Sequence, residues 1–251
     1  MPRTSSSMGQ LLNGTYSDRI CVSVYGRDFA QLSKNVSLAQ SFGAGFVELR
    51  LDYLSSPLTV VTQLRNFIDH KTSWILTFRS PGECGVNRIS EKLRKEILLK
   101  IISEVRPPFI DIELETLETF SEVQDALRSN SGTTELIASS HDFRKTEDSR
   151  GLKDLITKTA RRYNPSIIKI VRHAKDFKDN LTMLSLYRLV ETKNPAKLVA
   201  FCMGPLGMYS RIACVSYGSP FTYAALPGQE TASGQLDAQS MQILLNSWEV
   251  K

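Results

Sequence analysis

The sequence lacks any apolar run of about 18 residues, the length that a helix needs to cross a membrane. Its opening segment, residues 1–18, is polar, is rich in serine and glycine, and lacks the apolar core of a secretory signal peptide. We therefore predict no membrane partner and a flexible N-terminal tail over residues 1–18.

Cysteine is scarce, and its spacing excludes the usual metal and redox motifs. There is no Cys-x-x-Cys pair, and no Cys, His and Asp cluster has metal-ligand spacing, so we predict no metal. A chain of 251 residues can bury a core without disulfides, which indicates reduced thiols and a cytoplasmic protein. The four cysteines are Cys21, Cys84, Cys202 and Cys214.

Nucleotide-binding signatures are also missing. The segment Val24–Asp28 follows the first β-rich run without a Gly-x-Gly-x-x-Gly pattern, and no Walker lysine motif occurs, so we predict no cofactor. The net charge is +5, but the basic residues are scattered and no nucleic-acid-binding motif accompanies them. The charge fits a pocket for a small anionic substrate, and we predict no nucleic-acid partner.

What the sequence does contain is a regular alternation of short β-rich runs with amphipathic stretches. The runs are rich in β-branched residues and have the length of buried strands. The predicted strands are Ile20–Val24, Gly45–Arg50, Trp74–Arg79, Phe109–Glu113, Thr134–Ser140, Ser166–Val171, Leu198–Phe201 and Pro220–Tyr223.

Helical periodicity fills most of the intervals, although the segments after the first and seventh strands are less clear. Strands alternating with helices favour parallel pairing, and eight units in this length match a (β/α)8 TIM barrel forming one domain over residues 19–251. A doubly wound open sheet is the alternative. The predicted helices are Leu58–Asp69, Ser90–Val105, Leu117–Arg128, Leu152–Tyr163, Phe177–Glu191 and Leu236–Trp248.

Polar side chains gather where the predicted strands end. Alternate strand residues of a barrel point inward, and the carboxyl ends carry the chemistry. This parity turns Glu48 and Arg50 of the second strand, and Arg79 of the third, toward the barrel mouth. On the seventh strand the same reasoning gives an apolar wall of Phe201 and Met203.

Lys169 is the most informative residue, because it lies inside a short apolar run that reads as a buried strand. A buried ammonium is costly unless it is paired, and burial together with Arg50 and Arg79 would favour the neutral amine, the form that makes imines. His141 ends the fifth strand and suits proton transfer near neutral pH. Glu83, in the loop after the third strand, could hold His141 in one tautomer.

The other acids and histidines receive simpler interpretations. Asp111 and Glu113 share the inward parity of the fourth strand and are interpreted as inner ion-pair partners. His70 ends a helix and is expected at the surface. His173 follows Lys169 by four residues and remains an alternative proton carrier.

Taken in order and spacing, several of these segments resemble type I 3-dehydroquinate dehydratase, the (β/α)8 enzyme of the shikimate pathway. The resemblance runs from Ile20 to about Trp248, and no single segment is specific by itself. The matching segments are Val47–Asp52, Thr77–Ser80, Ser140–Phe143, Ile168–Ile170, Met203–Arg211 and Ser233–Gln235.

The resemblance implies a mechanism and a set of roles. Lys169 would form an imine with the C3 ketone of 3-dehydroquinate. His141, oriented by Glu83, would remove the C2 proton and then protonate the departing C1 hydroxyl in a syn elimination. Arg211 would bind the substrate carboxylate, for which a guanidinium fork is well suited.

The resemblance also implies roles for the rest of the pocket. It implies in addition that the protein assembles as a homodimer. Ring hydroxyls would be held by Glu48, Arg50 and Arg79. Thr231 and Gln235 would lie on a loop after the eighth strand that closes over the substrate, with Gly228 and Gly234 allowing it to move. The apolar walls would be Phe143, Met203 and Tyr223.

The chain also departs from the family pattern. Thr231 stands for a common serine and keeps the hydroxyl, Ser233 stands for a common proline, and residues 172–174 replace a more apolar stretch. Two other functions stay open at this point. A class I aldolase would also use an imine lysine on the sixth strand, and a ligand-sensing barrel would keep the pocket without the chemistry.

Overall fold

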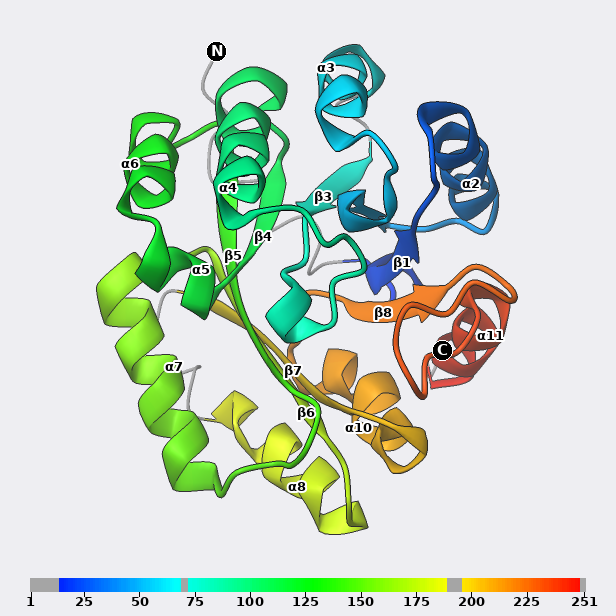
Figure 1. Ribbon diagram of the computed structural model, residues 1–251. Coiled ribbons are helices and arrows are strands. Elements are labelled where there is room, and N and C mark those ends of the chain that lie inside the picture. Colours follow the sequence, from blue (N-terminus) through cyan, green and yellow to red (C-terminus); the bar gives the residue numbers. More distant parts are fainter. Residues whose placement is uncertain (1–13, 69–71, 189–195, 249–251) are drawn as a thin grey trace.

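The computed structural model describes residues 14–68, 72–188 and 196–248. Its strands form one sheet of eight, in which every pairing is parallel and the order is β7-β6-β5-β4-β3-β2-β1-β8. The helices surround this sheet, as Figure 1 shows. The strands are β1 (Ile20–Val24), β2 (Phe46–Arg50), β3 (Ser73–Thr77), β4 (Phe109–Glu113), β5 (Glu135–Asp142), β6 (Ile167–His173), β7 (Lys197–Met203) and β8 (Thr222–Ala225).

This arrangement confirms the predicted (β/α)8 barrel over the open sheet, because the last strand returns to pair with the first. Among the described residues β7 and β8 share no hydrogen-bonded ladder. Side chains span that seam instead: the rings of Phe201 on β7 and Tyr223 on β8 have centroids 6.1 Å apart.

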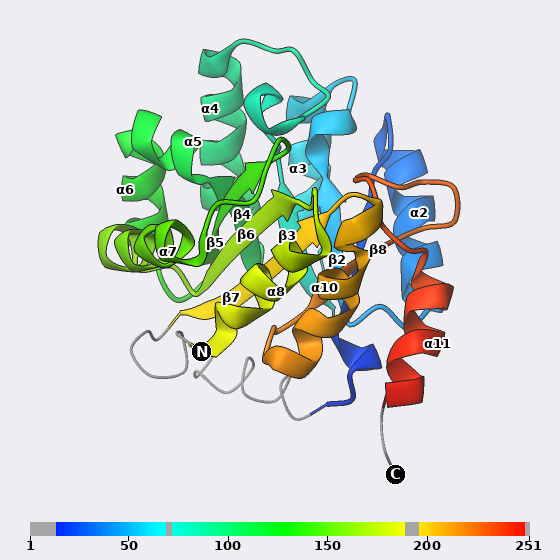
Figure 2. The ribbon, with the colours of Figure 1, turned by 90° about the horizontal axis from the view of Figure 1, so that it is seen from below.

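The helices follow the strands in the alternation that the sequence indicates. Figure 2 shows α7, α8 and α10 beside β6 and β7; α7 contacts β6, and α8 and α10 contact β7. The helices are α2 (Phe29–Ser41), α3 (Pro57–Phe67), α4 (Glu91–Lys100), α5 (Leu114–Thr119), α6 (Ser121–Ser129), α7 (Ser149–Tyr163), α8 (Phe177–Ser185), α10 (Met208–Ala213) and α11 (Ala238–Trp248).

Two helices occupy the intervals that the sequence left unassigned. Asp28 caps α2, since its carboxylate accepts the Gln31 backbone N–H at 2.8 Å. The short α10 follows a 3₁₀ turn at Pro205–Gly207 and packs on β7 and α8. Neither helix was evident from the sequence, because a capping residue and a short run of mixed polarity give little helical periodicity in hydrophobicity.

Several predicted boundaries were wrong by a few residues. Strand β3 ends at Thr77, so Arg79 lies in the following loop, whereas β6 continues to His173. The helix predicted over residues 117–128 is two helices, α5 and α6, which meet at Phe120. The ends of two other predicted helices, and His70, fall outside the described residues.

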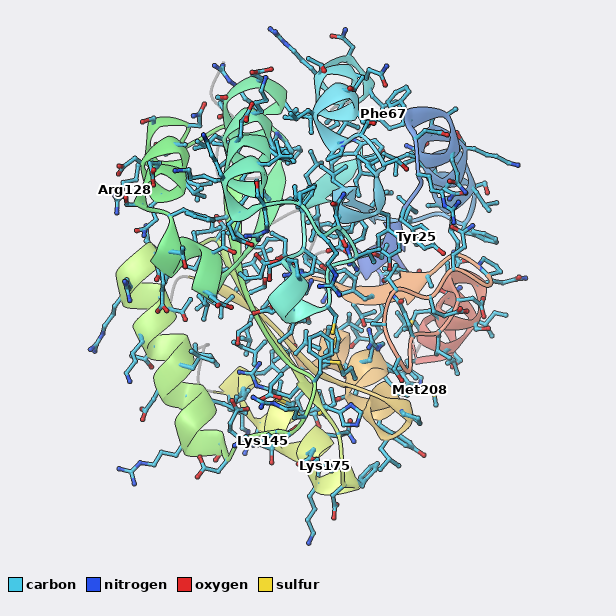
Figure 3. All side chains as sticks on the ribbon, in the orientation of Figure 1. Tyr25, Phe67, Arg128, Lys145, Lys175 and Met208 are labelled. Atoms are coloured by element: carbon cyan, nitrogen blue, oxygen red, sulfur yellow. The ribbon has the colours of Figure 1, made fainter. Side chains whose placement is uncertain are left out.

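Strand parity explains how the barrel presents its chemistry. On β6, Ile168 and Ile170 are buried in the apolar core, while Lys169 and Val171 line an internal cavity, as alternation requires. Figure 3 shows side chains filling the space between strands and helices. No described helix has both the length and the apolar character to span a membrane. At the N-terminal end, Ser17–Arg19 form a 3₁₀ turn; residues 1–13 of the predicted tail lie outside the description.

Candidate active site

One cavity at the carboxyl ends of the strands gathers the residues that the sequence analysis proposed for chemistry or substrate binding, apart from the alternative proton carrier His173. It lies where active sites of (β/α)8 barrels are found. The nominated residues that line it are Glu48, Arg50, Arg79, Glu83, His141, Lys169, Arg211, Thr231 and Gln235, together with Phe143, Met203 and Tyr223 from the expected walls.

Lys169 lies at the floor of this cavity with a side chain that is almost fully buried. Its residue exposure is 4%. The ammonium donates to Asp111 Oδ2 at 2.8 Å and to the Tyr223 hydroxyl at 2.9 Å, and it lies 3.7 Å from Glu48 Oε1. The groups nearest the lysine are therefore carboxylates rather than the arginines that the sequence analysis expected beside it.

Arg79 organises the acids around Lys169. Its guanidinium reaches Asp111 at 3.0 Å and Glu113 at 3.2 Å, so the interpretation of both acids as inner ion-pair partners is correct. Although burial opposes ionisation of Asp111, the charges of Arg79 and then Lys169 hold the pKa of its carboxyl well below the usual range. Asp111 is thus an anion at neutral pH.

His141 and Glu83 form a second, separate pair. The His141 Nδ1 and Glu83 Oε2 atoms are 2.6 Å apart, as the sequence analysis expected. The 3₁₀ turn Pro81–Glu83 holds the carboxylate there, because the Ser80 side chain caps its start and the Ser80 backbone N–H is bound by Glu113 at 2.9 Å. Because Nδ1 is bound to Glu83, Nε2 is the ring nitrogen that is available to a ligand in the cavity.

Burial shifts both members of this pair toward their neutral forms. Burial raises the pKa of Glu83 to about 8, despite the neighbouring Arg79 charge. Burial, with the charges of Arg79 and Lys169, lowers the pKa of His141 well below its usual value. Below about pH 8 the carboxyl proton points at Nδ1 and Nε2 carries the ring proton; above it Nδ1–H donates to the carboxylate and Nε2 has a free lone pair.

This proton inventory predicts how activity depends on pH. Because only the deprotonated pair offers a base at Nε2, kcat/KM should rise with pH and level off above about 8. In Glu83→Gln the plateau should fall about 10-fold to 100-fold, and the rise should move to lower pH, since His141 alone then titrates. Rate profiles from pH 5 to 10 measure both effects. A flat wild-type profile across pH 6 to 9 would contradict the assignment.

Arg211 is a buried cation without an anionic partner among the described residues. Its exposure is 2%, and it forms no ion pair with any residue that the structure describes. Its Nε has no hydrogen-bond partner, and its guanidinium stacks on Phe201, with 4.6 Å from Cζ to the ring centroid. Burial lowers the pKa of Arg211 to about 10, which still leaves it charged at neutral pH. Such a group is suited to an anionic ligand.

Replacing Arg211 by methionine should therefore weaken substrate binding without destabilising the protein. Loss of a buried charge contact with an anion should raise KM about 10²-fold. The temperature of unfolding should stay level or rise, because an unpaired buried charge disappears. Steady-state kinetics and thermal denaturation measure the two effects, with the exposed Arg144→Met as control. An unchanged KM would remove Arg211 from the binding site.

The loop after β8 closes one side of the cavity and is tied down at several points. The Gln235 side chain accepts the Thr231 N–H at 2.9 Å and donates to the Ala224 carbonyl at 3.1 Å. The Ser233 carbonyl accepts from Gly204 N–H at 3.0 Å and from Arg211 Nη2 at 3.4 Å. Both contacts use a carbonyl that proline also has, so serine at this position preserves them.

Residues 172–174, which depart from the family pattern, do not line the cavity. Arg172 binds Glu147 at 2.6 Å and the Ser140 carbonyl at 2.8 Å. The His173 ring lies against Gly204 and does not line the cavity. Its position favours His141 over His173 as the proton carrier.

Sequence reasoning missed two features of the site. Tyr223 contributes a hydroxyl to Lys169 as well as an apolar wall. Asp111 contacts the lysine directly, which the shared inward parity of β4 and β6 could have indicated. Cys84, in the loop after β3, also lines the cavity, with a left-handed backbone (φ 61°).

Comparison with known proteins agrees with this geometry. A family model for type I 3-dehydroquinase matches residues 20–251. The chain belongs to this family. It is therefore a dehydratase, that is, a lyase, and the predicted family is confirmed.

Individual relatives extend the comparison. The chain is 38% identical over 194 residues to 3-dehydroquinate dehydratase of Pyrobaculum aerophilum, covering 77% of this chain and 60% of that protein. It is 34% identical over 212 residues to 3-dehydroquinate dehydratase of Dehalococcoides mccartyi, covering 84% and 89%. The structure of the Aquifex aeolicus 3-dehydroquinate dehydratase superposes with a TM-score of 0.74 at 28% identity, covering 92% of this chain and 99% of that one.

Proposed function

We propose that this protein converts 3-dehydroquinate to 3-dehydroshikimate and water through an imine on Lys169. The observation that carries the proposal is the buried lysine of β6 in one cavity with the His141–Glu83 pair and the unpaired Arg211. These are a nucleophile, a base with its orienting carboxylate, and an anion site, which are the parts that the reaction needs.

The reaction divides into four steps on these residues. The Lys169 amine attacks the C3 ketone, and loss of water gives a protonated imine that withdraws electrons from C2. His141 Nε2 removes the C2 proton. The same nitrogen then protonates the C1 hydroxyl, which departs as water, and use of one base on one face makes the elimination syn. Hydrolysis of the imine frees the product.

Substrate binding follows from the charges that line the cavity. Arg211 holds the carboxylate, and Glu48, Arg50 and Arg79 face the ring hydroxyls. Thr231 and Gln235 close the cavity from the loop after β8. Phe143, Met203 and Tyr223 pack against the carbon ring, which keeps bulk water away from the imine.

Borohydride trapping tests this function directly. The protein is mixed with 3-dehydroquinate, reduced, digested and mapped by mass spectrometry, while an unreduced sample is followed by enone absorbance. An adduct on Lys169 together with rising absorbance supports the imine dehydratase. If product formed without an adduct, the protein would be a dehydratase that does not use the lysine. If folded protein gave neither an adduct nor a rise in absorbance, the proposed function would be rejected.

The family match weighs against the two alternatives that the sequence left open. Neither an aldolase nor a ligand-sensing barrel is described by that family. The cytoplasmic location and the homodimer implied by the resemblance are proposals too. Light scattering of the purified protein tests the homodimer, and a mass of one chain would reject it.

A further inference from the structure

The hydroxyl of Tyr223 lies between two groups that the proposed reaction must protonate and deprotonate in turn. It accepts a hydrogen bond from Lys169 Nζ at 2.9 Å and faces Glu48 Oε1 at 3.5 Å. Lys169 and Glu48 are themselves 3.7 Å apart, which is too long for a direct hydrogen bond. The hydroxyl lies within the hydrogen-bond limit of both groups, although its contact with Glu48 is at the long end of that limit.

The imine chemistry creates a proton problem at this place. Lys169 is held as an ion pair, yet only the amine attacks a ketone, so one proton must leave the nitrogen first. The hydroxyl of the carbinolamine must later gain a proton to depart as water. The site is buried, so both transfers need a nearby protein group.

Asp111 is the nearer carboxylate but a poor proton acceptor. Arg79 and Lys169 hold its pKa well below the usual range, although burial opposes this. Glu48 has no arginine within ion-pair distance among the described residues; the hydroxyls of Ser23 and Thr77 bind it at 2.7 and 2.8 Å. Its carboxylate is thus the better placed to take a proton and return it.

We propose that Tyr223 relays protons between Lys169 and Glu48 during imine formation. The inference rests on the proposed function and adds a residue to it. Burial raises the pKa of Tyr223 well above its usual value, so the phenol keeps its proton and can accept from one side while donating to the other.

The relay balances over the two halves of imine formation. First, Lys169 gives a proton to the Tyr223 oxygen while Tyr223 gives its own to Glu48, which leaves an amine, a phenol and a carboxylic acid. The amine lone pair bonds to the ketone carbon, and a nitrogen proton moves to the former ketone oxygen. Then the proton returns from Glu48 through Tyr223 to that hydroxyl. The C–O bond breaks with its electron pair, water leaves, and the nitrogen lone pair completes the protonated imine.

The test is the rate at which the Lys169 adduct appears in Tyr223→Phe. This variant keeps the ring against Lys169, whose Nζ lies 4.2 Å from the ring centroid, and removes only the hydroxyl. Rapid mixing with 3-dehydroquinate and timed borohydride quenching follow adduct formation. The rate should fall about 10²-fold, while conversion of adduct to enone keeps its rate constant. In Glu48→Gln and in the double variant the loss should be similar, because the two groups act as a unit.

A matched control separates relay from folding. Tyr187→Phe removes another buried tyrosine hydroxyl, which binds the backbone of Ala200 and lies outside the cavity. It should leave adduct formation unchanged. Wild-type rates in Tyr223→Phe, or equal slowing in both variants, would overturn the relay while the proposed function stands. Absence of an adduct from the wild type would overturn both.

Discussion

Replacing Lys169 by methionine will abolish dehydration, with a fall in kcat on the order of 10⁵-fold. The reason is that no other amine reaches the cavity among its lining residues, so the covalent electron sink is lost entirely. Methionine has similar length and no charge, and Asp111 keeps its ion pair with Arg79 at 3.0 Å. The variant should therefore fold, and circular dichroism together with an assay of enone formation separates lost chemistry from lost structure.

The control for this experiment is Lys175→Met. Lys175 follows the same strand but is exposed, and it does not line the cavity. Its loss should leave the rate and the trapped adduct as in the wild type. If folded Lys169→Met retained more than about 1% of activity, the imine could not be the main route, since covalent catalysis by a missing amine is impossible.

Strand parity is the reason that so much of the site was predictable. The direction of a side chain follows from its position in a strand. The two-residue period therefore predicts that Glu48, Arg50 and Lys169 point into the barrel, without any knowledge of strand pairing. The resemblance to a known family added what parity cannot supply, namely the residues outside the strands: Arg211 on α10 and Gln235 on the loop after β8. The structure brings both sets to one cavity.

Loops and pairwise contacts were the parts that the sequence could not provide. Arg79 lies two residues beyond β3, and its inward direction depends on ion pairs with Asp111 and Glu113 rather than on strand geometry. Glu83 reaches His141 through a capped 3₁₀ turn, a local conformation that no periodicity announces. Parity places Asp111 and Lys169 inside the barrel, but the 2.8 Å distance between them also depends on the relative register of two non-adjacent strands, which parity does not give.

His141→Ala should separate the two halves of the reaction. Without the base, removal of the C2 proton falls to water, and kcat should decrease about 10⁴-fold. The contacts of Lys169 with Asp111 and Tyr223 do not involve His141, so the amine remains able to attack the ketone. Borohydride should then trap, in high yield, the reduced imine between Lys169 and 3-dehydroquinate. The mass of this adduct should show that the C1 hydroxyl is still present.

The matched variant His173→Ala decides between the two histidines that the sequence offered. His173 lies outside the cavity, so its loss should leave the rate near that of the wild type. If folded His141→Ala formed no adduct, His141 would be needed for imine formation itself. Proton transfer during imine formation would then not be carried out by the groups that contact Lys169. If His173→Ala lost activity and His141→Ala kept it, His173 would be the base, because a base must reach the proton that it removes. The short contact between Glu83 and His141 would then have only a structural role.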